Sequence, residues 1–142
     1  MEETKSQGKI SRPLLITIIG VFFIVWEILV LLDFTGISSP KMNGQVVNVI
    51  LGFRVFGTYA KVMDVVQLII IGLMIYGIFK MNKLLGCVLP FAYMVYAFVS
   101  VHSWALMDIT ATKRAKLGYD IFALIGGGLI CLVLYLNKDK FK

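Results

Sequence analysis

The distribution of apolar residues along the chain predicts four helices long enough to cross a lipid bilayer, at about residues 13–32, 62–79, 84–102 and 118–136. About 20 apolar residues in a helix, with a rise of about 1.5 Å each, match the roughly 30 Å hydrocarbon core of a bilayer. The pattern therefore predicts an all-α, polytopic membrane bundle. Residues 13–136 form its single domain, between a polar tail over residues 1–12 and a basic tail over residues 137–142.

The first apolar run, from Pro13 to Leu32, contains a single charged residue, Glu27. An ionised carboxylate facing lipid costs at least about 3 kcal/mol, so Glu27 is expected to face the other helices. Gly20 and Phe23 precede it by seven and four residues and share its helical face. A small residue on that face allows a second helix to approach closely.

Residues 33–61 form the one long connection, and its first part is rich in turn-forming residues. Its second part is apolar but interrupted by Asn48, Gly52, Arg54 and Gly57. This pattern predicts an interfacial or re-entrant helix at about residues 45–58. The alternative is a second helix that simply projects beyond the membrane.

The remaining helices follow one another closely. Residues 80–83 make a tight connection, so the second and third helices are expected to be antiparallel neighbours. Pro90 is expected to kink the third helix. Three consecutive glycines, Gly126–Gly128, would allow another backbone to approach the fourth helix.

Composition supports a membrane protein: 59 % of the 142 residues are hydrophobic and the mean hydropathy is +0.89. The net charge of +6 comes from short clusters between the apolar runs, which is typical of orientation signals and not of nucleic-acid binding.

Four spans place both termini and the turn at residues 80–83 on one side. That side carries eight basic residues: Lys5, Lys9, Arg12, Lys80, Lys83, Lys138, Lys140 and Lys142. The opposite side carries six: Lys41, Arg54, Lys61, Lys113, Arg114 and Lys116. We therefore expect a cell-membrane protein with both termini in the cytoplasm.

This topology places the polar residues of the apolar runs in the outward half of the bundle: Glu27, Asp64, Gln67, Tyr96, Ser100, His102 and Asp120. In the third helix, a spacing of three and four residues puts Tyr93, Tyr96, Ser100 and Ser103 on one polar and aromatic face. Grouped carboxylates in a medium of low dielectric constant are typical of proton or cation pathways. Alternatively, Asp64 and Asp120 are boundary residues at helix N-termini, and Glu27 makes a structural contact within the bundle or to another subunit.

Other reactive side chains indicate structural roles. Cys87 and Cys131 lie within apolar runs without a CxxC pattern, so small buried side chains are favoured over redox use. His102 lacks a ligand pair at helical spacing, so no metal site is expected. Trp104 and Tyr119 are typical of interfacial belts. The sequence has no nucleotide-binding loop, nucleophile elbow or zinc-protease motif, so neither an enzyme nor a cofactor is expected.

These observations favour a non-catalytic accessory subunit whose partners are the lipid bilayer and other integral membrane subunits, or a second copy of the chain. One alternative is a small proton- or cation-coupled carrier or channel that uses Glu27, with Asp64 and Asp120 at its mouth. A second alternative is a membrane thiol-redox protein that uses Cys87 and Cys131.

The two ends of the chain carry a resemblance. Arg12 and Pro13 open an Ile- and Leu-rich helix, and Tyr135-Leu136 precede a basic tail that contains Phe141. With the spacing of the apolar runs, these features resemble a broad group of small prokaryotic four-helix membrane proteins that has no established function. The chain departs from that group at residues 33–61 and at Glu27. The resemblance implies a prokaryotic source and no catalytic residue.

Overall fold

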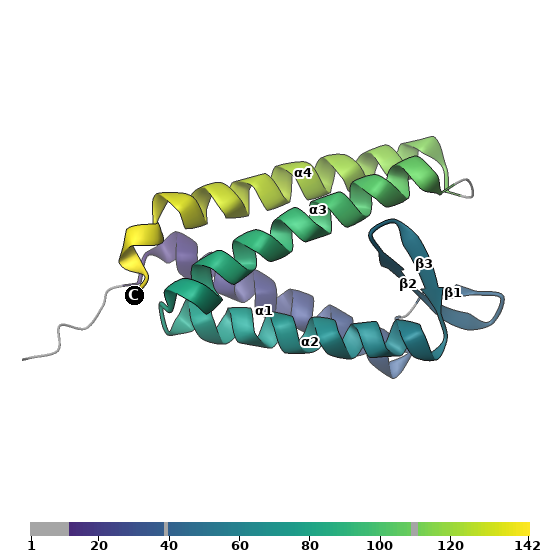
Figure 1. The fold of residues 1–142 in the computed structure, drawn as a ribbon, viewed down its shortest axis with the longest axis horizontal. Helices are drawn as coiled ribbons and strands as arrows, with labels where there is room; N and C mark the ends of the chain where they lie inside the picture. Colours follow the sequence, from purple (N-terminus) through teal and green to yellow (C-terminus); the bar gives the residue numbers. More distant parts are fainter. Residues whose placement is uncertain (1–11, 39, 109–110) are drawn as a thin grey trace, which may run out of the picture.

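The computed structural model describes residues 12–38, 40–108 and 111–142 and contains four long helices and a small sheet (Figure 1). The elements follow in the order α1 (Leu14–Thr35), β1 (Lys41–Met42), β2 (Gln45–Ile50), β3 (Phe53–Phe56), α2 (Thr58–Phe79), the π-helical turn η1 (Leu84–Val88), α3 (Leu89–Met107), α4 (Lys113–Leu136) and the 3₁₀ turn η2 (Lys138–Lys140). Four helices, with η1 and α3 counted as one, are long and apolar enough to cross a membrane, so this part of the prediction is confirmed. The predicted tail over residues 1–12 lies, except for Arg12, outside the described residues.

The helices form two antiparallel hairpins, α1 with α2 and α3 with α4. Figure 1 shows the hairpins close together at the end that carries the C-terminus and apart at the other end, where the sheet lies between them. α1 and α4, the outer members of the two hairpins, make little contact with each other. The sheet therefore occupies the open end of a V-shaped pair of hairpins.

At the closed end, the backbones of α2 and η1 touch at Gly77 and Gly86. A Cβ atom added at Gly77 would overlap backbone atoms of Leu85 and Gly86, and one added at Gly86 would overlap the backbone of Gly77 and Ile78. Such close approach of two backbones needs glycine on both sides. Pro90 lies in the first turn of α3, and the π-helical turn η1 ends at Val88, two residues before it.

The C-terminal residues fold back over this closed end. The N–H of Lys142 donates to the carbonyl of Met81 at 2.9 Å, and the N–H of Lys83 donates to the carbonyl of Lys142 at 2.7 Å. Phe141 is buried, with 4 % of its surface exposed. The predicted basic tail thus begins with η2 and packs onto the connection between α2 and α3.

The prediction of an interfacial helix at about residues 45–58 is wrong, and the prediction of an all-α fold is wrong for this segment. The segment forms the antiparallel sheet β1–β2–β3, and α2 begins only at Thr58, so the alternative of a longer projecting helix is also wrong. In the register of the sheet, Met42 pairs with Gln45 and Ile50 pairs with Phe53. Each connection between strands is therefore two residues long.

Both connections have the backbone of type I′ turns, which need positive φ at both central residues. Asn43 and Gly44 have φ of 52° and 77°, and Leu51 and Gly52 have φ of 48° and 90°. Asn-Gly between extended segments is a strong hairpin signal. The run from Val46 to Ile50 adds β-branched residues, which favour strands.

The sheet is attached to both helical hairpins. On the α2 side, the Asn48 amide donates to Asp64 Oδ1 at 2.8 Å. On the α3 side, the N–H of Leu51 donates to Ser100 Oγ at 3.0 Å, and a Cβ at Gly52 would lie 2.8 Å from Ser103 Cβ. The sheet thus connects α2 to α3 at the end where the hairpins diverge.

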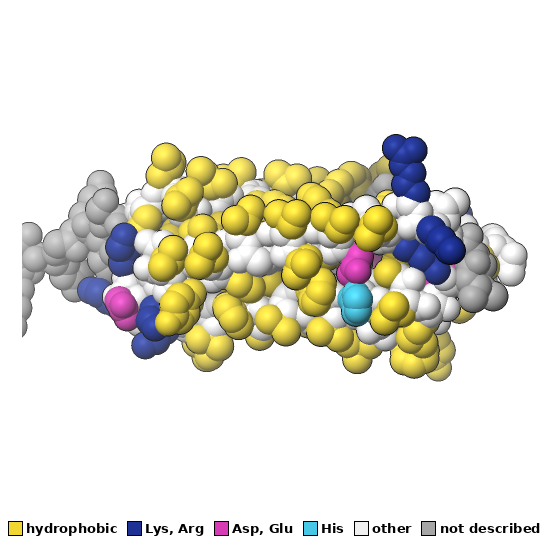
Figure 2. Space-filling model, turned by 90° about the horizontal axis from the view of Figure 1, so that it is seen from above, with side chains coloured by type: hydrophobic (Ala, Val, Ile, Leu, Met, Phe, Trp, Pro, Cys, Tyr) yellow, Lys and Arg dark blue, Asp and Glu magenta, His cyan; other side chains and the backbone are white. Residues whose placement is uncertain are grey.

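The outer surface agrees with a membrane environment. Figure 2 shows apolar side chains along the length of one face, with Lys and Arg side chains at the two ends. α4 is the least buried of the four long helices, with Leu134 as its one buried residue. This distribution matches the apolar middle and basic ends that the sequence predicts.

We predict that Gly77→Ala destabilises the fold by about 3 kcal/mol or more, because the added methyl group overlaps the backbone of η1. Thermal unfolding in detergent, followed by circular dichroism, measures this effect. Gly118→Ala is the matched control, since nothing lies within 4 Å of a Cβ at that position. Equal melting temperatures for the two variants would contradict a tight backbone contact at Gly77.

Candidate functional site

A cavity of about 1100 Å³ lies between the two helical hairpins, next to the sheet. All four long helices and the sheet contribute to its lining. The cavity exists because the hairpins diverge from their contact at Gly77 and Gly86 and the sheet fills only the far end of the gap (Figure 1). Its volume slightly exceeds the range for small-molecule sites, which is about 300–1,000 Å³.

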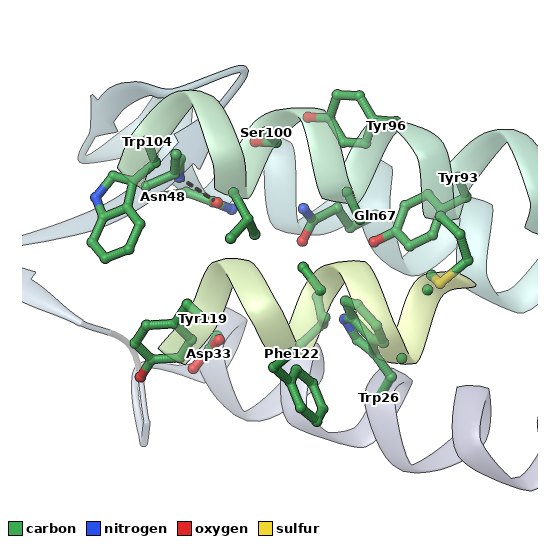
Figure 3. A pocket seen from close by; sticks show the side chains of 18 of the residues that line it. Trp26, Asp33, Asn48, Gln67, Tyr93, Tyr96, Ser100, Trp104, Tyr119 and Phe122 are labelled. Carbon is green, nitrogen blue, oxygen red and sulfur yellow. Dashed lines mark hydrogen bonds between the residues drawn. The ribbon is translucent and has the colours of Figure 1, made fainter. Parts of the chain in front are cut away.

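Aromatic and aliphatic side chains form most of the cavity wall. On the α1 side, Trp26 contacts Phe22 edge-on, with ring centroids 5.4 Å apart, and it contacts Tyr93 of α3 at 6.0 Å. On the α4 side, Phe122 lines the cavity and Tyr119 packs against Trp104 of α3 at 5.9 Å. Figure 3 shows the rings of Trp26, Tyr93, Trp104, Tyr119 and Phe122 around the cavity. The wall is therefore suited to an apolar molecule.

The end of the cavity near the sheet is polar. Asn48 of β2, Asp64 and Gln67 of α2, and Ser100 of α3 contribute side chains to it. Figure 3 shows the Gln67 amide and the Tyr93 hydroxyl directed into the cavity. The lining thus combines long apolar walls with hydrogen-bonding groups at one end.

Asp64 is the most deeply buried charged residue at this polar end, with 4 % of its surface exposed. Its Oδ1 atom accepts the hydrogen bond from Asn48, whereas Oδ2 is buried and has no hydrogen-bond partner among the described residues. A buried polar atom without a partner is unusual, since most are satisfied by protein or water. The described residues therefore leave one hydrogen-bond acceptor of Asp64, a residue of the cavity lining, unused.

The structure brings together four of the seven polar residues that the sequence places in the outward half of the bundle. Asp64, Gln67, Tyr96 and Ser100 all line the cavity. Tyr93, predicted to share a face with Tyr96 and Ser100, lines it as well. The polar and aromatic face of the third helix therefore faces the cavity.

Glu27 lies elsewhere, between α1 and α2. Its Oε1 atom is 3.2 Å from the position that a Cβ on Gly72 would occupy, so the side chain faces α2, as expected for a residue turned toward the bundle. Within the described part of the chain, its carboxylate has neither a hydrogen bond nor an ion pair. The structure does not place Glu27 in the cavity lining with Asp64.

His102 and Asp120 form a separate pair that connects α3 to α4. The Nδ1 atom of His102 lies 3.0 and 2.9 Å from the two carboxylate oxygens of Asp120. Figure 2 shows the histidine beside an acidic side chain on the outer face. Across residues 12–38, 40–108 and 111–142, no three His, Cys, Asp or Glu side chains are grouped closely enough to hold a metal ion.

The two cysteines are free thiols, and both lie where α4 packs against η1 and α3. The Sγ atom of Cys87 lies 3.8 Å from the carbonyl of Leu134, and that of Cys131 lies 4.0 Å from the carbonyl of Phe91. Each thiol therefore has a backbone acceptor on the facing helix. Neither cysteine is a cavity-lining residue.

Sequence reasoning missed the residues that join the sheet to the helices. Arg54 of β3 forms an ion pair with Asp108 at the end of α3, and Asp108 also accepts hydrogen bonds from Trp104 Nε1 at 2.8 Å and from the N–H of Ala111 at 3.1 Å. The Asn43-Gly44 turn was the available signal, because it predicts a hairpin whose second strand, β2, carries Asn48. Trp104 and Tyr119, expected in an interfacial belt, line the cavity.

The chain has no match among protein-family models, curated proteins or solved structures. A functional assignment therefore starts from the cavity and from the atoms that line it.

Proposed function

We propose that this protein is a non-catalytic integral membrane protein that binds an amphipathic, lipid-like molecule between its two helical hairpins. The cavity, with apolar walls and a polar end, is the observation that supports this proposal. An amphipathic molecule places its chain against Trp26, Phe22 and Phe122 and its polar group toward Asp64 and Gln67. Such a site buries apolar surface and still satisfies the polar groups at one end.

The position of the cavity supports entry from the lipid phase. Ile18 of α1 and Leu129 of α4 both line the cavity, and 53 % and 58 % of their surfaces are exposed. The cavity wall therefore reaches the outer surface at the seam between α1 and α4, where the two helices make little contact. In a bilayer, this seam faces the acyl chains.

An accessory-subunit role is the second candidate, and the low burial of α4 favours it. In that role, the seam between α1 and α4 receives a transmembrane helix of a larger complex. Both candidates use the same opening, and the mass of the bound species distinguishes them.

Native mass spectrometry of protein extracted gently from its own membranes tests the binding role. We predict that the wild-type chain carries a molecule of lipid size and that Ala97→Phe, which places a ring in the cavity, loses it. Ala92→Phe is the control, because Ala92 lies on the same helix but is exposed and outside the cavity lining. A bound protein chain would instead identify an accessory subunit. Equal occupancy in all three proteins would contradict binding in the cavity.

For the orientation, we propose that both termini are cytoplasmic and that the sheet lies on the outer side, as the excess of basic residues at the ends favours. In a background with Cys87→Ala and Cys131→Ala, we predict that Lys41→Cys reacts with a membrane-impermeant maleimide on intact cells. Lys138→Cys serves as the matched variant and reacts only after permeabilisation. The reverse labelling pattern would refute this orientation.

A further inference from the structure

We propose that the molecule bound in the cavity carries a protonated amine and that the Asp64 carboxylate binds it. This inference rests on the proposed binding function and specifies its ligand as a lipophilic amine. The juxtaposition of a buried carboxylate with aromatic side chains in the lining of one cavity carries it.

The first argument is the unpartnered oxygen. Asp64 is only 4 % exposed, Asn48 donates to its Oδ1 atom at 2.8 Å, and its Oδ2 atom has no partner among the described residues. A buried charge is stable only when it is paired and hydrogen-bonded. The neutral Asn48 amide supplies a hydrogen bond but no charge, whereas an ammonium group supplies both an N–H donor and the missing positive charge.

The second argument is the arrangement of the other charges that line the cavity. Arg54 forms an ion pair with Asp108 of α3, so its charge is compensated within the protein. Lys41 of β1 is exposed, and Asp33, at the end of α1, accepts a hydrogen bond from the exposed Ser38 hydroxyl at 2.6 Å. Among the described residues, Asp64 is therefore the one buried charged side chain in the lining. The polar end of the cavity, where Asp64 lies, therefore favours a cation.

The third argument is the aromatic lining. Trp26, Tyr93 and Tyr96 contribute rings to the same cavity, with 6.0 Å between the centroids of Trp26 and Tyr93 and 6.2 Å between those of Tyr93 and Tyr96. Aromatic faces attract ammonium groups, most strongly when water is excluded. Gln67 follows Asp64 by three residues and adds an amide oxygen on the same side of α2.

Other amphiphiles satisfy this site less well. A long-chain alcohol can donate a hydrogen bond to Asp64 Oδ2, but it leaves the carboxylate charge uncompensated. A fatty-acid carboxylate repels the Asp64 side chain and offers no donor. For ligands with the same apolar chain, we therefore expect the affinity to be highest for an amine, lower for an alcohol and lowest for a carboxylate.

The test measures binding of radiolabelled dodecylamine, which is cationic at neutral pH, to the full chain in phosphatidylcholine nanodiscs, with empty nanodiscs subtracted as background. Unlabelled dodecanol and dodecanoate serve as competitors. We expect the wild-type protein to bind dodecylamine at least about tenfold more tightly than dodecanol, and dodecanoate to compete least.

Asp64→Asn is the decisive variant, because the amide oxygen at this position still accepts the hydrogen bond from Asn48 while the charge is removed. We expect at least about a tenfold loss of dodecylamine affinity with dodecanol affinity unchanged, which also shows that the cavity is intact. Asp120→Asn is the matched control, since Asp120 pairs with His102 outside the cavity lining and its change leaves both affinities unaltered.

Each of the following results overturns the inference. Equal wild-type affinities for amine and alcohol would show that the charge of the ligand does not contribute to binding. An equal loss of affinity for both ligands in Asp64→Asn would show that Asp64 only maintains the shape of the cavity. If Asp64→Asn has no effect while Ala97→Phe abolishes binding of both ligands, the amine assignment fails and the binding function stands. Binding of neither ligand, or binding that Ala97→Phe leaves unchanged, contradicts the binding function as well.

Discussion

The contact between Gly77 of α2 and Gly86 of η1 is the constraint on which the rest of the structure depends. Two backbones meet there at a distance that no side chain tolerates, so the helical hairpins are fixed to each other at one end. At the other end, the sheet is attached to α2 through Asn48 and to α3 through Leu51. The glycine contact at one end and the sheet at the other (Figure 1) leave the cavity between them.

The helices could be predicted from the sequence because apolar length is a strong local signal. α1 ends at Thr35, three residues beyond the predicted bound, where Gly36 adopts φ of 84° and its N–H donates to the carbonyl of Asp33 at 3.0 Å, as expected for a glycine that terminates a helix. The sheet does not follow from apolar content, because the apolar residues at 45–58 fit an interfacial helix as well as strands. A two-residue turn with positive φ at both positions specifies a hairpin more strongly than apolar content specifies a helix.

The candidate site was predicted only in part, because depth along a helix is easier to infer than rotation about its axis. Ser100 and His102 differ by two positions, about 200° around a helix, so they face opposite directions. Ser100 lines the cavity, whereas His102 pairs with Asp120 on the outer face. Trp26 and Glu27 are consecutive and about 100° apart around the helix, and Trp26 lines the cavity whereas Glu27 faces α2. Which face of a helix meets a cavity depends on tertiary packing, which a single helix sequence does not specify.

The sheet keeps the two helical hairpins apart at the open end, and a distance measurement between α1 and α4 tests this role. In a cysteine-free background, spin labels at Leu31 of α1 and Leu117 of α4 report the separation at the open end, since both residues are exposed. A second pair at Leu15 and Leu136 reports the closed end and serves as the reference. When residues 41–56 are replaced by a flexible Gly-Ser linker, the account predicts a shorter open-end distance and an unchanged closed-end distance by electron–electron double resonance. An unchanged open-end distance would contradict the account, because the helices alone would then hold the cavity open.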